Sequence, residues 1–128
     1  MIIQGLKLLT HFDVIFALIT GTLGGMFIGA MPGLSASMAV ALLIPVTFSM
    51  SGEAGITLLA VVYTSAIYGG SITACLLHTP GTPASAATAA DGFALTKQGK
   101  GLKAIGTSTI CSMIGGTASA FALLLIAP

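Results

Sequence analysis

The sequence predicts an all-α, polytopic integral membrane protein with two broken or re-entrant helices. Of the 128 residues, 55% are hydrophobic and only 5% are charged, whereas a soluble globular domain carries roughly a quarter charged residues. Its long apolar runs are interrupted at Pro32-Gly33 and Pro80-Gly81. Proline inside a helix costs about 3 kcal/mol, so neither interruption fits a continuous helix. A net charge of +1 argues against nucleic acid as a partner.

Three apolar runs are long enough to cross a bilayer, whose hydrocarbon core needs about 20 helical residues. They are residues 14–31, 54–72 and 104–127. Glycines recur at every fourth position through the first run and just beyond it, at Gly21, Gly25, Gly29 and Gly33. Glycines at this spacing form a smooth helix face, which lets another helix approach closely. The first run is therefore predicted to pack tightly against a second helix.

The first broken segment covers residues 34–50. Ser35 is placed to cap a helix that begins at Ala36, because a serine side chain accepts a hydrogen bond from the first turn. Pro45 is expected to kink or end this helix. The helix would then have about half the length that a membrane requires.

The second broken segment covers residues 73–90. Pro80 and Pro83 remove backbone donors, and Gly81 between them permits a sharp reversal. Thr82 followed by Pro83 predicts a capping residue and a first-turn proline, so a new helix should start there. The pattern Pro-Gly-x-x-Ala-Ser occurs at both breaks, at residues 32–37 and 80–85, which suggests that they are equivalent features.

The helix after the second break is expected to end at Asp91-Gly92, and residues 93–103 are expected to form a polar loop. Three of the four cationic residues lie in this loop: Lys97, Lys100 and Lys103. An excess of lysine marks a cytoplasmic loop. The fourth, Lys7, suggests that the N-terminus is cytoplasmic too. This distribution favours treating the two broken segments alike, both crossing the membrane or both turning back.

Two broken helices at corresponding places predict a transport site, because helix N-termini inside a membrane present unpaired N–H groups and a partial positive charge. Such a place suits a carboxylate substrate. The candidate residues around the breaks are Ser35, Ser37, His78, Thr79, Gly81, Thr82 and Ser85. A coupling sodium ion or proton would use freed carbonyls and hydroxyls, for which the candidates are Gly33, Gly70, Ser71 and Thr73. The alternative is that the breaks only kink packed helices.

Several chemical readings remain open or are disfavoured. His78 is either a proton relay or substrate donor, or a neutral histidine satisfied by the backbone. Asp91 is either an ionisable site in the membrane or an interfacial turn residue, and its Gly92 neighbour favours the turn. No metal site, no cofactor other than the coupling ion and no catalytic residue is expected. Gly33-Leu34-Ser35-Ala36 resembles the motif of intramembrane serine proteases, but those enzymes show Gly-x-Ser-Gly.

Four motifs occur along the chain. They are Gly-x-x-x-Gly-x-x-x-Gly-x-x-Pro-Gly-Leu-Ser-Ala-Ser-Met at 21–38, Tyr-Gly-Gly-Ser-Ile-Thr-Ala at 68–74, Thr-Pro-Gly-Thr-Pro-Ala-Ser-Ala-Ala-Thr at 79–88 and Asp-Gly at 91–92. Together they closely resemble the large membrane subunit of tripartite tricarboxylate transporters, the TctA family. The resemblance covers nearly the whole chain.

This resemblance implies a multi-pass secondary transporter of the bacterial inner membrane that takes up citrate or a related carboxylate by symport with sodium or protons. Its expected partners are a small membrane subunit and a periplasmic solute-binding protein. Family members are several times longer, so residues 1–128 would be their N-terminal part and the first of two repeats. The apolar residues 121–126 also favour a fragment. The alternative function is a small channel or helix-assembly module without gradient coupling.

Overall fold

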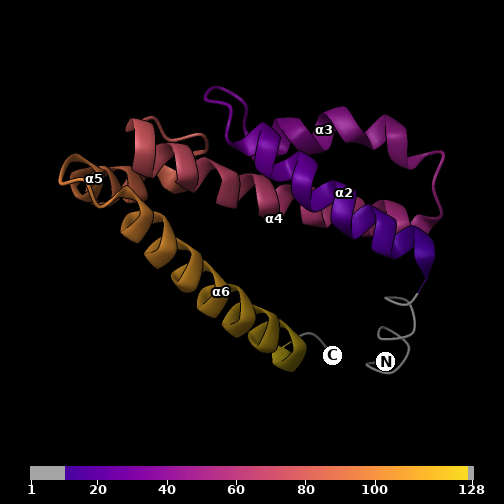
Figure 1. Cartoon of the computed structure of the whole chain (residues 1–128). Helices are drawn as coiled ribbons and strands as arrows, with labels where there is room; N and C mark the ends of the chain where they lie inside the picture. The colour runs from indigo at the N-terminus through magenta and orange to yellow at the C-terminus, as the bar shows by residue number, and fades with distance from the viewer. Residues whose placement is uncertain (1–10, 127–128) are drawn as a thin grey trace.

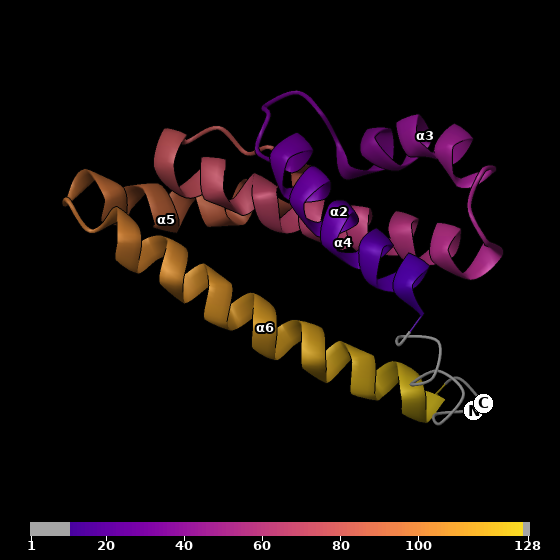
Figure 2. The ribbon, with the colours of Figure 1, turned by 45° about the vertical axis from the view of Figure 1, so that its right-hand side comes forward.

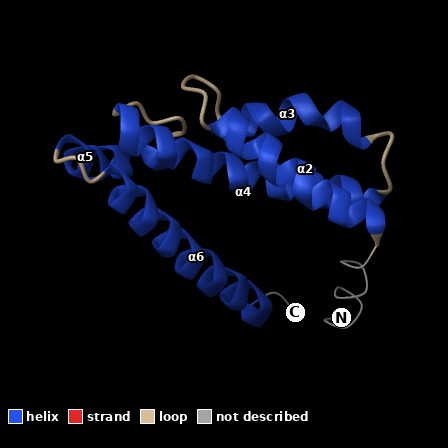
Figure 3. Ribbon diagram, viewed as in Figure 1, coloured by secondary structure: helices blue, strands red, loops and turns tan. Residues whose placement is uncertain are grey.

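The structure is a computed structural model in which residues 11–126 are described (Figure 1). This part of the chain contains helices and loops without a strand (Figure 3). The elements in order are α2 (Phe12–Gly29), α3 (Ala36–Thr47), α4 (Gly52–Leu77), the 3-10 turn η1 (Pro83–Ser85), α5 (Ala86–Lys97) and α6 (Gly101–Ile126). Three of them, α2, α4 and α6, are long and apolar enough to cross a membrane. The predicted all-α membrane class is confirmed.

The long helices cover the predicted spans, but their ends differ. α2 ends at Gly29, before the predicted limit at residue 31, and α6 already begins at Gly101. α4 continues past residue 72 to Leu77, where His78 closes it with a left-handed backbone (φ 57°). Pro80 disfavours helical geometry only for the residue before it and removes a donor only at its own position. The helix therefore persists almost to the proline. Lys7 and the last residue of the predicted span 104–127 lie outside the described residues.

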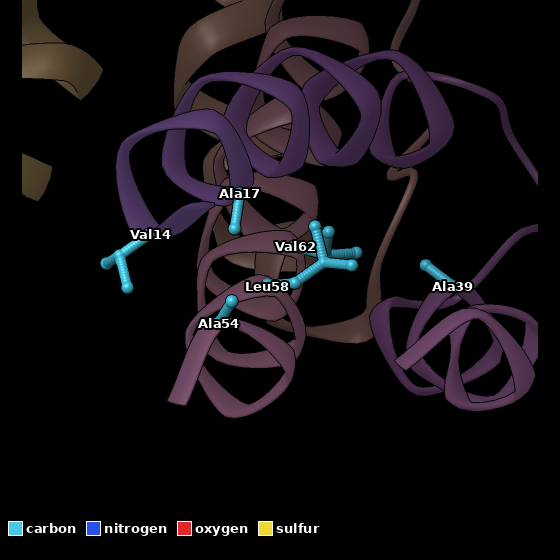
Figure 4. Packing of buried hydrophobic residues seen from close by; sticks show 6 residues of the cluster. All are labelled: Val14, Ala17, Ala39, Ala54, Leu58 and Val62. Atoms are coloured by element: carbon cyan, nitrogen blue, oxygen red, sulfur yellow. The ribbon is translucent and has the colours of Figure 1, made fainter. Parts of the chain in front are cut away.

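The centre of the fold is the contact between α2 and α4, which is made by small side chains (Figures 1 and 4). The core consists of Val14, Ala17, Ala39, Ala54, Leu58 and Val62. A Cβ atom on Gly25 would run into Ser65 and the backbone of Val62, and one on Gly29 would run into the backbone of Ala66. The Ser65 hydroxyl also donates a hydrogen bond to the Gly21 carbonyl at 3.2 Å. The predicted close packing of the glycine face is thus confirmed for these positions.

Gly33 does not belong to this face. It lies in the loop after α2 with a φ of +98°, and a Cβ atom there would meet nothing within 4 Å. The expectation that the four-residue glycine spacing continues to Gly33 is wrong, because α2 has already ended at Gly29. Gly33 serves the turn instead, where its positive φ suits glycine.

α3 returns along α4 toward the end where α2 begins. Its predicted cap is confirmed, since the Ser35 hydroxyl accepts a hydrogen bond from the Met38 amide at 3.2 Å. Thr47 at the other end packs against Gly55, near the start of α4. Pro45 lies inside the helix, which ends two residues later. With 12 residues at 1.5 Å each, α3 is about 18 Å long, roughly half of a membrane.

α5 is longer than predicted. It runs without interruption through Asp91 and Gly92 to Lys97, and only Gln98–Lys100 separate it from α6. The expected helix end at Asp91-Gly92 and the expected loop at 93–103 are therefore wrong. Gly92 faces Cys75 on α4, where a Cβ atom would meet the cysteine side chain and Cα. The last turn is held by a hydrogen bond from the Thr96 hydroxyl to the Cys75 carbonyl at 2.7 Å.

The two broken segments have different topologies. After α4 the chain returns to the level of Gly70, where the Gly81 amide approaches the Gly70 carbonyl at 3.5 Å. α5 then runs alongside the last part of α4 in the same direction, so this segment turns back (Figures 1 and 2). α3 instead runs back to the beginning of α4. The inference that both segments behave alike is therefore wrong.

As a consequence, the start of α2 and the link between α5 and α6 lie at opposite ends of α4. Val14 packs in the core with Ala54 near the start of α4. Gly101 packs against Leu76 near the end of α4. The inference from the lysines that both segments behave alike failed because it counted crossings, whereas the return of residues 78–82 along α4 depends on contacts between distant parts of the chain.

Candidate functional site

The second break meets α2 and α4 at three glycines. A Cβ atom on Gly81 would run into the Gly29 carbonyl, and it would lie 2.8 Å from the Gly70 Cα and 3.2 Å from the Thr73 hydroxyl. Only glycine allows the three backbones to come this close. This contact joins the end of α2, the interior of α4 and the Pro-Gly break. Gly70 and Gly81 are among the predicted site residues, and Gly29 is an addition to them.

Buried hydroxyl groups surround the glycine contact. Thr82 and Ser85 are 3% and 1% exposed, and their hydroxyl oxygens lie 2.8 Å apart in a hydrogen bond. The Thr73 hydroxyl, also buried, donates to the Gly70 carbonyl at 3.1 Å. Thr82 occupies the predicted position before η1, but its side chain makes no capping bond to the backbone. The hydroxyls of this break are therefore occupied by one another and by the chain.

The second break leaves few backbone donors for an anion. Pro83 has no N–H group. The Ser85 amide donates to the Thr82 carbonyl at 3.0 Å, and the Ala86 amide donates to the Pro83 carbonyl. In the first turn only the Ala84 amide remains, because the tight 3-10 geometry uses the others. This break holds the start of α5 in place and offers little to a carboxylate.

The first break retains free donors. The first four amides of an α-helix have no partner within it, and Ser35 satisfies only the Met38 amide. The amides of Ala36 and Ser37 therefore have no hydrogen-bond partner in the described part of the chain and lie at the positive end of the helix dipole, although Ala36 itself is buried. The Ser37 side chain is exposed beside them, and Ser35 is half-buried.

The N-terminus of α3 lies beside the middle of α4. Ala39, one turn into α3, packs in the core with Leu58 and Val62 of α4. Val62 is ten residues beyond Gly52, where α4 begins, which corresponds to about 15 Å along the helix. A membrane core is about 30 Å thick, so the free amides of α3 begin near its middle.

His78 is directed toward α5. Its Nδ1 donates to the Ala89 carbonyl at 3.2 Å, and its ring stacks on Phe93 with 4.7 Å between the ring centroids. The Nζ atom of Lys97 lies 5.1 Å from the centroid of the Phe93 ring. Of the two roles considered for His78 from the sequence, this geometry matches a histidine whose hydrogen bond is made with the backbone. Thr79 beside it is exposed, and no hydrogen bond among the described residues joins either residue to the Thr82–Ser85 pair.

A cavity of about 560 Å³ opens between α4, α5 and α6. It is lined by Ile67, Ser71, Cys75, Ala84, Ala87, Thr88, Asp91, Gly92, Leu95, Ala104, Thr107, Ser108, Cys111 and Ser112. Ser71, predicted with Gly70 and Thr73, is turned away from them and lines this cavity. Asp91 lines it too. The sequence left Asp91 open as an ionisable site but favoured a turn residue because Gly92 was taken for a helix end, whereas helical spacing from Ala84 through Thr88 to Asp91 points to one face of α5.

Comparisons with known proteins identify the family of this chain. The family model described as "Tripartite tricarboxylate transporter TctA family" matches residues 15–128. An uncharacterized 52.8 kDa protein of Agrobacterium vitis, from the ttuC' 3' region of TAR-I, is 33% identical over 120 residues, which cover 94% of this chain. The chain spans 24% of that relative. No solved structure matches this chain significantly. The chain belongs to the tripartite tricarboxylate transporter TctA family, a family of transporter membrane components.

Proposed function

We propose that this chain forms part of the large membrane subunit of a tripartite transporter in the bacterial inner membrane. The transporter takes up citrate or a related carboxylate by cation-coupled secondary transport. A periplasmic solute-binding protein delivers the substrate, and a small membrane subunit completes the assembly. Family membership supports the class of protein, and the two half-length helices support a binding site within this segment.

The observation that carries the proposal is the opposed direction of α3 and α5. Each has 12 residues, and each begins beside the interior of α4. α3 runs toward the start of α4 and α5 runs toward its end, so both N-termini face inward (Figure 1). Helix N-termini that lie inside a transporter receive anionic substrate groups. The free amides of Ala36 and Ser37 make the start of α3 the carboxylate-binding end, and the second break anchors α5 opposite it.

The alternative of a helix-assembly module finds less support. This alternative required the glycine face of the first span to be free to associate with another helix, for example in a second copy of the chain. Gly21, Gly25 and Gly29 are instead buried against α4 of the same chain. Their close packing is therefore used within the fold.

The site is tested by Ser37→Ala. If the Ser37 hydroxyl donates to the substrate carboxylate, its removal should weaken citrate binding about tenfold, which corresponds to about 1.4 kcal/mol and to the lower range for hydrogen bonds to charged groups. The dissociation constant is measured with radiolabelled citrate on the full-length membrane subunit in detergent. The matched control is Ser49→Ala, an exposed serine beyond the other end of α3. Equal constants for the two variants would remove Ser37 from the site.

The orientation is tested by cysteine labelling. The lysine-bearing link between α5 and α6 is expected to be cytoplasmic, and the turn before Gly52 lies at the other end of α4. Gln98→Cys should therefore react with an impermeant thiol reagent only after the inner membrane is opened. Ser51→Cys should react in cells with an intact inner membrane. Gln98 is preferable to Gly99, whose φ of +76° disfavours a side chain. The reverse pattern would invert the topology, and labelling of both from one side would contradict the path of α4.

A further inference from the structure

The open cavity between α4, α5 and α6 carries polar groups from all three helices, although most of its lining is apolar and Asp91 is exposed. Six of its side chains carry an oxygen: Ser71 on α4, Thr88 and Asp91 on α5, and Thr107, Ser108 and Ser112 on α6. They come from three helices and face one space of about 560 Å³. Since a water molecule occupies about 30 Å³ in the liquid, this volume accommodates an ion together with its hydration water.

The charge of the lining favours a cation. Among residues 11–126, Asp91 is the single charged residue that lines the cavity, and none of the lysines near the link contributes to it. A carboxylate substrate would be repelled by Asp91, whereas a small cation would be attracted. Carboxylate and hydroxyl oxygens are the ligands that hard cations prefer. Ionisable residues that face a cavity within a membrane protein mark ion pathways.

The position of the cavity connects it to the second break. Ser71 and Ala84 line one part of it, directly beside Gly70 and Pro83 in the sequence. Leu95 and Ala104 line another part, near the link between α5 and α6. The cavity therefore extends from the link to the anchored start of α5. An ion bound there would contact α4 and α5, the two helices on either side of the second break.

We propose that Asp91 and the surrounding hydroxyl groups bind a hard monovalent cation of the size of Na⁺, and that this is the coupling cation. The coupling role rests on the proposed transport function, while the binding itself does not. The site replaces the one expected around Gly70 and Thr73. The Gly70 carbonyl already accepts from the Thr73 hydroxyl and faces the Gly81 amide, so it has little capacity left for an ion.

Binding of radioactive Na⁺ to the full-length membrane subunit, measured without any carboxylate, tests the proposal. Wild type should bind Na⁺ saturably, and Asp91→Asn should weaken binding at least tenfold. The control is Asp13→Asn, which alters a carboxylate beside a separate cavity of about 210 Å³ at the start of α4. No saturable binding, or equal binding by the two variants, would overturn the site. Citrate binding is measured in a separate experiment, so the Na⁺ binding result can be interpreted even if the proposed carboxylate site is wrong.

A second measurement requires no substitution of Asp91. Cys111 is exposed and lines the same cavity, so its reaction with small thiol reagents reports the local charge. A cationic methanethiosulfonate should react there several times faster than an anionic one, and Na⁺ should slow the cationic reagent more than choline does. Modification is quantified at Cys111 by peptide mass spectrometry. Equal rates for the two reagents, or no reaction, would show that the cavity is not a cation-selective aqueous space.

Discussion

Gly29→Val is expected to lower the free energy of unfolding by about 3 kcal/mol, near the upper end of the usual cost of overpacking. A Cβ atom on Gly29 would run into the Ala66 carbonyl oxygen and lie 2.6 Å from the Ala66 carbonyl carbon and Cα. These are backbone atoms of α4, which cannot rotate away as a side chain can. α2 and α4 would have to separate, which would break the hydrogen bond between Ser65 and Gly21 and move Gly81 from its place against Gly29.

Gly24→Val is the matched control, because it introduces the same side chain into the same helix. A Cβ atom on Gly24 meets nothing within 4 Å, and the helix-propensity cost of valine is similar at both positions. The measurement is the temperature at which the full-length subunit loses its monodisperse peak in size-exclusion chromatography. Gly29→Val should melt well below Gly24→Val. Similar melting temperatures would mean that α2 and α4 are not in contact at Gly29.

The features that the sequence predicted correctly are local ones. Ser35 caps α3 through the amide three residues ahead, and the glycine spacing marks one face of a helix whatever its partner is. The partner of that face was not predictable. Small residues occur in every apolar run of this chain, so nothing in the sequence singles out Ser65 and Ala66 as the surface that Gly25 and Gly29 contact.

The failures have a common cause in contacts between distant residues. Gly92 was expected to end a helix, since glycine costs about 1 kcal/mol in a helix interior. That cost is offset where Gly92 lets α5 approach Cys75, and the hydrogen bond from Thr96 to the Cys75 carbonyl adds to the contact. The same extension of α5 brings Asp91 to the cavity. The wrong helix end is therefore also the reason why the sequence favoured a turn residue over an ionisable site at Asp91.

The second break shows the same limit within a site. Its sequence predicted the position of Thr82 before a helical turn, and the structure agrees. The direction of the hydroxyl was not predictable, because it depends on the 3-10 turn that brings Ser85 within 2.8 Å. Thr82 and Ser85 are both buried, and neither lines a cavity described above. Their hydroxyls are thus expected to stabilise the break without touching the substrate.

A double-mutant cycle on Thr82 and Ser85 tests that expectation. Thr82→Val keeps the shape of the side chain but leaves the Ser85 hydroxyl, 1% exposed, without its partner, which should cost about 2 kcal/mol of stability. Ser85→Ala strands the Thr82 hydroxyl at a similar cost. In the double variant neither hydroxyl is stranded, so the total loss should fall short of the sum by about 1–2 kcal/mol.

The cycle is measured by denaturant unfolding of the full-length subunit in detergent. Thr64→Val combined with Ser85→Ala serves as the control, because Thr64 is exposed and bonds only within α4, so its effect should simply add. Additive losses for Thr82 and Ser85 would mean that their hydrogen bond contributes nothing to the fold. The citrate dissociation constant of Thr82→Val should stay within about twofold of wild type, a difference below about 0.5 kcal/mol. A tenfold change would instead place the substrate carboxylate at the second break and make Thr82 its ligand. A buried hydrogen bond between Thr82 and Ser85 that only stabilises the fold gives no reason for citrate to bind more weakly.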